Sequence, residues 1–378
     1  MPTQNNPLSD TVELLISGKM HRDWSRYDID SNLLTPADAW HVTLGMSGGQ
    51  MPPDVVTGAP VEVRIGGDTV LTGRVDEIEH QVSKTNHSFS MSGRDHAAAL
   101  VDCSAPIFVA KMVGLKELVA KIVSSFGIKK YRIDAESTRS REKINIEPGD
   151  SAWDALAHAA EANGLWPWFE PDGTLVIGGP DYTTPVVATL ILRRDGLGNN
   201  VISLDKNESV HSRYSQVTVL GQMHGTDFEQ GKNALRGSWT DDGVTWYRPK
   251  IVTDHECDNT AVCIDRAHKL ISDGRLNGLT LSAVVKGHRI VAPGQASDQM
   301  LWKPGMRIRV ISDPHNLDAI YFLMGRKFLR SRMDGTRTAL TLKEDGVWVP
   351  DAHPHKRKHR RGKNSVPGVI LNVPGMSQ

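Results

Sequence analysis

Cysteine is scarce in this sequence, which has 378 residues and three thiols, at Cys103, Cys257 and Cys263. Three thiols cannot build a disulfide framework, so the chain fits folding in a reducing cytoplasm. The first twenty residues lack the basic start and apolar core of a secretory signal. No apolar run approaches the ~18 residues that a membrane span needs. We therefore expect a soluble protein that is made in the cytosol.

Net charge is also absent, because 44 Lys and Arg balance 44 Asp and Glu. The balance hides an uneven distribution. Residues 351–378 hold six Lys or Arg and one Asp, a net of +5, so the rest of the chain carries about −5. The six cationic residues are Lys356, Arg357, Lys358, Arg360, Arg361 and Lys363. A chain that is basic throughout is thus excluded, and the positive charge is a feature of the C-terminus.

Sequence motifs for nucleotide or calcium binding are missing as well. The glycine-rich run 225–233 has one residue too many for a phosphate-binding loop, and Asn233 stands where a Mg²⁺-binding hydroxyl is needed. The run that starts at Asp28 begins like a calcium loop, but Leu33 replaces the turn glycine and Ala39 replaces the bidentate glutamate. We interpret both segments as surface loops.

Zinc sites and catalytic sites are not indicated either. His255, Cys257, Cys263 and His268 have irregular spacing, so buried thiols and surface histidines are the simpler interpretation. The motifs Gly-x-Ser-x-Gly and His-Glu-x-x-His do not occur. We expect no catalytic residues, no metal, no cofactor and no small-molecule substrate.

Two parts of the chain show the alternation of β-strands. Apolar residues alternate with polar ones from 61 to 65, and the turn residues 66–68 follow, as a hairpin requires. Similar patterns return near the end of the chain. Short strands joined by turns are typical of small barrels. We predict a first β-barrel at 1–105 and a second one built from 181–222 and 280–350.

Between these regions the hydrophobic period changes to that of a helix. Apolar residues recur on one face from 115 to 126, and Gly127 follows as a C-terminal cap. With a second helix predicted from 151 onward, residues 106–180 become an α/β unit with two helices. Residues 223–279 are expected to be an inserted loop and helix that packs near this unit. The predicted fold class is α+β, mainly β, with two similar small β-barrels and an inserted α/β unit.

The two β regions resemble each other weakly. Gly73-Arg74 matches Gly325-Arg326 at an offset of 252 residues, and neighbouring strand patterns match at offsets of 245 and 251. Any two β-meanders share such patterns, so a duplication is a hypothesis. Glycine inside a strand often marks a bulge or a close approach of two backbones. If the regions are duplicated, Gly73 and Gly325 should occupy equivalent positions.

Several motifs occur in a recognisable order. They are the runs 73–79 and 92–102, the helix start 148–153 with 163–165 and 172–175, and the segments 212–221, 301–305 and 335–342. Their order resembles that in the baseplate hub proteins of contractile phage tails, and the Mu-type hub (the Mu tail protein P class) is most similar. Late-control D proteins and type VI spike bases are more distant. The resemblance covers about residues 10–350.

This resemblance implies a structural protein and not an enzyme. Three copies would form a pseudo-sixfold ring from two barrels each, joining the sixfold tail tube to the threefold spike. DNA would pass through its channel without sequence recognition. The implied partners are the copies of the homotrimer, the tail spike protein, the tail tube and other baseplate proteins. The protein would be assembled in the host cytoplasm and reside in the virion.

Two alternatives remain open. A spike-base component of a phage-like bacteriocin or of a secretion machine would share most of these features. A tail-associated peptidoglycan hydrolase is a third reading, although no segment of ~100 residues is left over for a lytic domain.

The C-terminal tail lies outside the resemblance. Its six cationic residues are candidate contacts to a partner or to DNA, and an apolar, proline-containing stretch follows at 366–374. We predict that residues 364–375 dock on the spike or on an adjacent hub chain as an added strand or extended peptide. A wholly disordered tail is the alternative.

Overall fold

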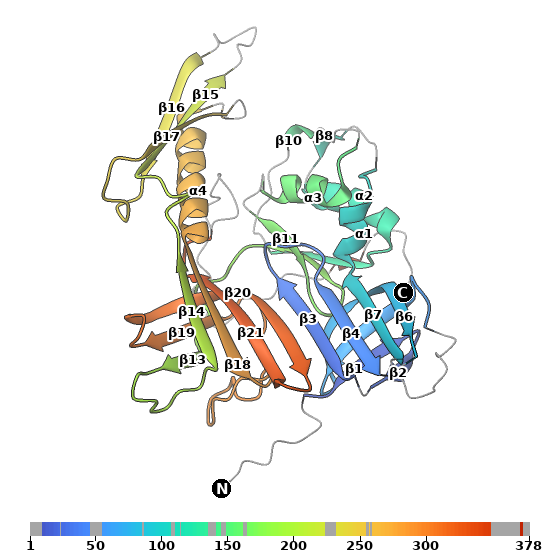
Figure 1. The fold of residues 1–378 in the computed structure, drawn as a ribbon. Coiled ribbons are helices and arrows are strands. Elements are labelled where there is room, and N and C mark those ends of the chain that lie inside the picture. The colour runs from blue at the N-terminus through green and yellow to red at the C-terminus, as the bar shows by residue number, and fades with distance from the viewer. Residues whose placement is uncertain are drawn as a thin grey trace.

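The computed structural model describes residues 10–348 and 371–372, apart from positions 23, 46–54, 85–86, 107–109, 114, 135–140, 145–148, 162–164, 224–231, 255–256 and 258. Strands dominate this part of the chain, and the helices gather in two separate places (Figure 1). The mainly β, α+β fold class predicted from the sequence is confirmed. Within the described residues, no helix combines the length and the apolar character of a membrane span.

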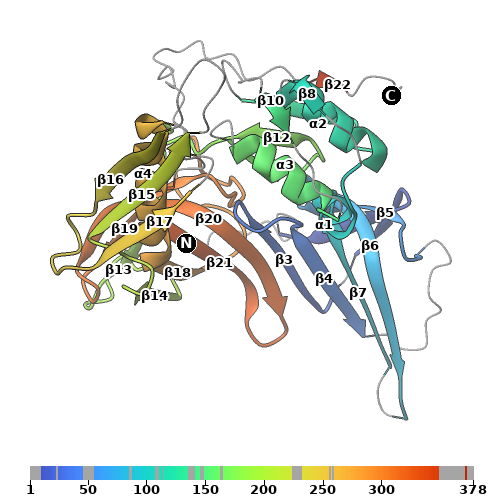
Figure 2. The same ribbon diagram turned by 90° about the horizontal axis from the view of Figure 1, so that it is seen from above.

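The first β region contains seven strands. They are β1 (Val12–Ile16), β2 (Lys19–His21), β3 (Arg26–Asn32), β4 (Ala39–Gly45), β5 (Pro60–Ile65), β6 (Asp68–Val82) and β7 (His87–Asp95). Their order in the sheet is β3-β4-β7-β6-β5-β1-β2. The alternation predicted for β5 is present, because Val61, Val63 and Ile65 are buried while the residues between them are not. The hairpin of β6 and β7 projects from the body of the protein (Figure 2).

The α/β unit follows directly. Its elements are α1 (Ala97–Asp102), β8 (Ala110–Val113), α2 (Leu115–Val123), the 3₁₀ turn η1 (Ser124–Phe126), β9 (Lys130–Ile133), β10 (Arg141–Ile144), α3 (Ala152–Glu161), β11 (Trp166–Phe169) and β12 (Leu175–Gly178). The predicted apolar face of α2 is buried, and Gly127 adopts the expected left-handed conformation with φ 72°. The backbone N–H of Asp154 donates to the hydroxyl of Ser151 at 3.0 Å, which caps α3.

The second β region is assembled from two separated stretches of chain. Its strands are β13 (Val186–Leu192), β14 (Ser203–Glu208), β18 (Leu279–Lys286), β19 (Arg307–Ser312), β20 (Leu317–Ser331) and β21 (Gly335–Glu344). Their order is β14-β18-β21-β20-β19-β13. The strands expected at 280–350 are therefore present.

One antiparallel strand pair joins the two β regions. β3 pairs with the C-terminal half of β20, with Tyr27 opposite Arg330 and Asn32 opposite Gly325. All thirteen strands thus form one continuous sheet, and one hydrophobic core runs through both regions. The sequence did not predict this link, which makes the two regions halves of a single β structure.

The segment between β14 and β18 forms a unit of its own. It contains β15 (Gln216–Met223), β16 (Lys232–Thr240), β17 (Pro249–Thr253) and α4 (Thr260–Gly278). The three strands make a separate sheet in the order β16-β15-β17, and α4 packs on β15 and β16. Residues 216–222 were expected in the second β region and belong instead to this unit. The unit was also expected near the α/β unit, but α4 reaches β18 and β21 of the second β region.

Two glycines let helix α4 approach its sheet closely. A Cβ added at Gly221 would collide with Cys257 and Cys263, and one added at Gly237 would overlap the backbone of Cys263 and Ile264. The helix backbone therefore lies directly on the strands at these points.

We expect Gly237→Ala to lower the free energy of unfolding by about 1–3 kcal/mol, because the methyl group must push α4 away from β16. The exposed Thr240→Ala in the same strand is the control and should change it by less than ~0.5 kcal/mol. Urea denaturation measures both. Equal effects of the two substitutions would contradict the close approach.

Candidate interaction sites

The strand order is the same in the two β regions. The series β3-β4-β7-β6-β5-β1 corresponds to β14-β18-β21-β20-β19-β13, and the corresponding strands also follow one another in the same chain order. One difference is that β1 is antiparallel to β5, whereas β13 is parallel to β19. The common strand order supports a duplicated fold, and this argument does not depend on the match between Gly73 and Gly325.

The register places Gly73 and Gly325 differently. The pairing of β6 with β7 shifts between Val75 and Glu77, and that of β20 with β21 shifts between Leu323 and Gly325. Gly73 lies before the first shift and Gly325 lies directly after the second. When these bulges are aligned, the residue that matches Gly73 is Tyr321. The register thus argues against the equivalence expected from the sequence.

The two neighbouring arginines also have different surroundings. Arg74 is exposed, and its Nη1 donates to the carbonyl oxygen of Gly58 at 2.7 Å. Arg326 is 6% exposed, its Nη1 donates to the carbonyl oxygen of Ile29 at 2.9 Å, and its guanidinium lies 4.1 Å from the ring centre of Phe328. Arg326 therefore belongs to the seam between β3 and β20, whereas Arg74 holds a surface loop.

Gly73 and Gly325 should respond differently to a methyl group. A Cβ at Gly73 would overlap the carbonyl oxygen of Arg94, whereas one at Gly325 would meet the side-chain amide of Asn32 at 3.0 Å. We expect Gly73→Ala to cost about 1–3 kcal/mol of unfolding free energy and Gly325→Ala clearly less, because a side chain yields more easily than a strand backbone. Thermal unfolding of both variants checks this, and a larger loss for Gly325→Ala would refute it.

A buried histidine links the two β regions across the seam. His288 is fully buried; its Nε2 lies 2.8 Å from the hydroxyl of Tyr27 and its Nδ1 lies 3.1 Å from Oγ1 of Thr338. Thr338 donates its own hydroxyl proton to the carbonyl of Gly287 at 2.6 Å, so it accepts from His288. His288 is then neutral, protonated on Nδ1, and Tyr27 donates to Nε2.

Sequence reasoning missed this network because its members are far apart in the chain. Tyr27 and His288 are separated by 261 positions, and neither stands in a recognisable motif. Burial, together with the nearby charges of Arg326, Arg289 and Arg330, lowers the pKa of His288 to about 3. The histidine therefore stays neutral in the folded protein over the physiological pH range.

This network predicts a pH-dependent stability. The pKa of His288 is lower in the folded chain than in the unfolded chain, so stability is present above pH ~6.5 and is lost toward pH 3. Between pH 7 and pH 4.5 the wild type should lose about 2–3 kcal/mol more than His288→Gln, whose side chain cannot take up a proton. Urea unfolding at both pH values tests this, and equal losses would show that His288 is protonated in the fold.

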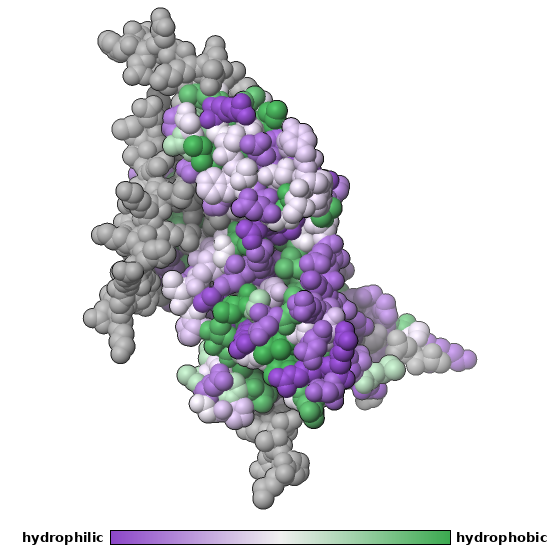
Figure 3. Space-filling model, turned by 90° about the vertical axis from the view of Figure 1, so that its left-hand side faces the viewer, coloured by the Kyte–Doolittle hydropathy of each residue, from purple (hydrophilic) through white to green (hydrophobic). Residues whose placement is uncertain are grey.

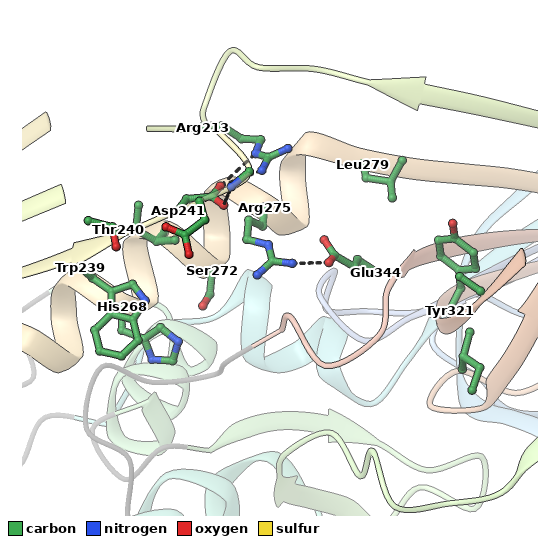
Figure 4. Close-up of a pocket in the computed structure, with 15 residues that line it drawn as sticks. Arg213, Trp239, Thr240, Asp241, His268, Ser272, Arg275, Leu279, Tyr321 and Glu344 are labelled. Atoms are coloured by element: carbon green, nitrogen blue, oxygen red, sulfur yellow. Dashed lines mark hydrogen bonds and ion pairs between the residues drawn. The ribbon is translucent and has the colours of Figure 1, made fainter. Parts of the chain in front are cut away.

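A polar groove of about 620 Å³ separates the α4 unit from the second β region. Figure 4 shows its two ion pairs, Arg213 with Asp241 at 2.8 Å and Arg275 with Glu344. On one side of the groove the ring of Trp239 lies against that of His268 at an angle of 39°, with ring centres 4.5 Å apart. Four of the charged groups that line the groove are thus paired with each other, and Asp242 is a further carboxylate on its lining.

The same side of the molecule carries apolar surface. Figure 3 shows hydrophobic residues gathered between polar ones over the second β region. The large apolar side chains exposed in this half of the chain include those of Leu197, Ile202, Val210 and Ile320. Patches of this kind are typical of surfaces that bind other proteins.

The described end of the C-terminal tail is a short added strand. β22 (Leu371–Asn372) pairs with β9, with Leu371 opposite Tyr131. The expected mode of docking is therefore present at these two residues, but the acceptor is the chain's own α/β unit and not the spike or an adjacent chain. The six cationic residues Lys356, Arg357, Lys358, Arg360, Arg361 and Lys363 lie outside the described residues.

The cysteines and the possible metal ligands among the described residues lie apart from one another or in the core. In the part of the chain that the structure describes, no group of three or more His, Cys, Asp or Glu residues could hold a metal. Cys257 and Cys263 lie in the core of the α4 unit, where burial raises the pKa of Cys257 to about 12 and also raises the pKa of Cys263. Both thiols are thus poor nucleophiles at neutral pH.

Four domain families match in succession: "Mu phage baseplate assembly protein GpP-like, N-terminal" at 11–95, "Baseplate hub protein gp44-like, second domain" at 97–179, "Tail protein NMB1110-like, third domain" at 213–271 and "Tail protein, C-terminal domain" (NMB1110-like) at 273–347. The third match coincides with the α4 unit.

Whole-chain comparisons agree. The crystal structure of the tail protein from Neisseria meningitidis MC58 is 42% identical, with a TM-score of 0.78 over 91% of this chain and 99% of that one. Baseplate hub protein gp44 of Escherichia phage Mu is 23% identical over 96% of this chain and 95% of its own. The chain therefore belongs to the Mu-type baseplate hub family of phage tail proteins.

A likeness of fold extends to secretion machines. The E. coli c3393 protein, a component of the type VI secretion system, is 14% identical, with a TM-score of 0.58 over 90% of this chain and 80% of that one. At this identity the likeness concerns the fold alone.

Proposed function

We propose that this chain is the structural hub of a contractile phage baseplate, acting as a homotrimer. Two similar β regions in each of three copies give six similar units around one axis. Such a ring matches a sixfold tail tube on one side and a threefold spike on the other, and leaves a central channel for DNA ejection. The observation that carries the proposal is that one strand edge is paired within the chain while the corresponding edge of the other β region is not.

One edge is used within the chain, and its counterpart is open. The C-terminal half of β20 pairs with β3. In the other β region, the equivalent half of β6, residues 77–82, pairs within the described residues with β7 only. Strand β14, the equivalent of β3, likewise pairs there with β18 only. An open strand edge of this length can pair with a strand of another chain.

The internal seam predicts how two copies would join. When the bulge of β20 is aligned with that of β6, Leu329 corresponds to Gln81. When the strand pairings are then followed from β20 to β14 and from β6 to β3, Asp205 corresponds to Asp28. Leu329 pairs with Asp28 inside the chain. Gln81 would therefore face Asp205 of a neighbouring copy. In this head-to-tail arrangement, β6 of each copy pairs with β14 of the next. The ring closes after three copies if neighbouring β regions of two copies are rotated relative to each other by the same angle as the two β regions of one chain.

Side chains near this seam favour concentration-dependent assembly. Val82, which is 69% exposed, would lie opposite Leu204, so apolar surface is covered. However, this seam would also bring together like charges, those of Glu77, Glu79 and Asp205. Salt screens such repulsion between exposed groups, so trimers should form more readily at moderate ionic strength than at low ionic strength.

Cross-linking tests the seam directly. Gln81→Cys and Asp205→Cys are combined with Cys103→Ser, which removes the exposed native thiol. A short bis-maleimide should convert this protein into covalent trimers, because opposite residues on paired strands have Cβ atoms ~5 Å apart. Gln81→Cys with Asp242→Cys is the control and should stay monomeric. Closed dimers or hexamers, or equal linkage in the control, would refute the ring.

Assembly with other tail proteins is a separate question. Light scattering of the hub mixed with a candidate spike protein should show three copies of each in one complex. A spike-base component of a phage-like bacteriocin or secretion machine would behave in the same way, and the proteins encoded next to it would separate these readings. We further propose that the chain is not an enzyme. Clearing in a cell-wall zymogram would instead support a peptidoglycan hydrolase.

A further inference from the structure

Strand β17 forms an open edge of the sheet in the α4 unit. The strand order is β16-β15-β17, and β17 pairs within the described residues with β15 only. Four of its five residues are exposed. The unit extends away from the thirteen-stranded sheet (Figure 1), and the trimer proposed above makes no use of this edge. Backbone groups on the outer side of β17 are therefore able to pair with a further strand.

Large apolar side chains are exposed on this edge and directly before it. Trp246, Tyr247 and Ile251 are 48%, 87% and 69% exposed. Ile251 lies opposite Thr218 in β15, whereas the neighbouring Val217 belongs to the core beneath α4. Because successive side chains of a strand point to opposite faces, Ile251 lies on the face that α4 leaves uncovered. Exposed aromatic and apolar side chains of this kind are typical of a surface that binds another protein.

Two cations lie at the same edge and form no ion pair with any described residue. Arg248 and Lys250 both lie over the ring of Tyr214, at 5.7 and 4.8 Å from its centre. Nη2 of Arg248 donates to the carbonyl oxygen of His211 at 2.9 Å, but its Nε is buried without a hydrogen-bond partner. Lys250 lies opposite Val217, so it points to the face that α4 covers. Both positive charges are available to an anionic group.

The described carboxylates on either side of β17 in the chain are engaged elsewhere. Asp241 pairs with Arg213 at 2.8 Å, and Asp254 pairs with Arg266 at 3.1 Å. Asp242 lines the polar groove between the α4 unit and the second β region. The edge of β17 is thus cationic on one face of the sheet and apolar on the other.

We propose that this edge binds an extended, acidic segment of another tail protein, which adds to the sheet as a strand beside β17. Every second side chain of such a segment would lie next to Arg248 and Lys250, and those between them would lie next to Ile251. The segment should therefore alternate acidic and apolar residues. Backbone hydrogen bonds supply affinity in this mode of binding, and the side chains supply specificity.

Peptide binding to the full chain tests the proposal. The probe is a fluorescent synthetic peptide of about ten residues in which Glu and Val alternate. One comparison peptide has Lys in place of Glu, and another has the same Glu and Val residues in two blocks. Fluorescence anisotropy should show that the alternating acidic peptide binds about tenfold more tightly than either comparison peptide. Its binding should weaken as salt is added, because salt screens exposed charges.

Substitutions at the edge separate the two faces. Lys250→Glu should weaken binding of the acidic peptide about tenfold or more, because it places a carboxylate beside those of the peptide. Ile251→Thr keeps the β-branched shape, removes apolar contact and should weaken binding about threefold. The matched control Lys116→Glu makes the same charge change at an exposed position of α2 and should leave binding unchanged.

Hydrogen exchange measured by mass spectrometry shows whether the peptide is added as a strand. Backbone amides of residues 249–253 should exchange more slowly in the presence of the acidic peptide, because the open N–H groups of β17 then have a partner. Binding without slower exchange in β17 would reduce the contact to an ionic one and overturn the added strand.

The remaining outcomes identify the alternatives. Equal binding of the acidic and basic peptides, or no binding, would show that Pro249 and Lys250 only protect this edge from pairing, and would overturn the proposal. Self-association of the wild type that Lys250→Glu abolishes would make a second copy of this chain the occupant, in place of another tail protein. The cross-link between positions 81 and 205 tests the trimer at other residues, so either proposal can fail without the other.

Discussion

The pairing of β3 with the C-terminal half of β20 is the contact on which the rest of the structure depends. It turns two β regions into one thirteen-stranded sheet with a common core. His288 and Arg326 are buried because this seam is closed. The buried polar groups in turn help to fix the register, since a shift by one residue would separate Tyr27 from His288 and break the hydrogen bond between them.

The same pairing explains why one half of the protein has open strand edges. Strand β20 meets β3 within the chain, while the equivalent edge of β6 carries Glu77, Glu79 and the exposed Val82. Charged side chains on an edge strand oppose non-specific pairing with other chains. The internal seam contains buried polar contacts such as that of Tyr27 with His288, whereas the outer edge of β6 is exposed in the single chain.

How far the sequence predicted the structure follows from the range of the interactions. Local signals were sufficient for α2 with its cap at Gly127 and for the alternating strand β5. The pairing of β3 with β20 could not be predicted, because no local sequence pattern links Tyr27 to Arg330, which are far apart in the chain. Strand β16 was read as a polar loop, since its burial depends on α4 lying on Gly237. The glycine match failed because both glycines precede an arginine while the bulges lie at different distances from them.

One loop differs strongly between the two halves. In the first half, the short connection from β3 to β4 contributes Leu33 and Asp38 to the lining of a cavity of about 360 Å³. In the second half, the equivalent connection from β14 to β18 contains the whole α4 unit. In the proposed ring of three copies the strands of the two halves must stay alike, but this loop lies outside the shared ladders. The two halves can therefore differ at this loop, with a cavity in the first half and a folded domain in the second, while the sheet stays the same.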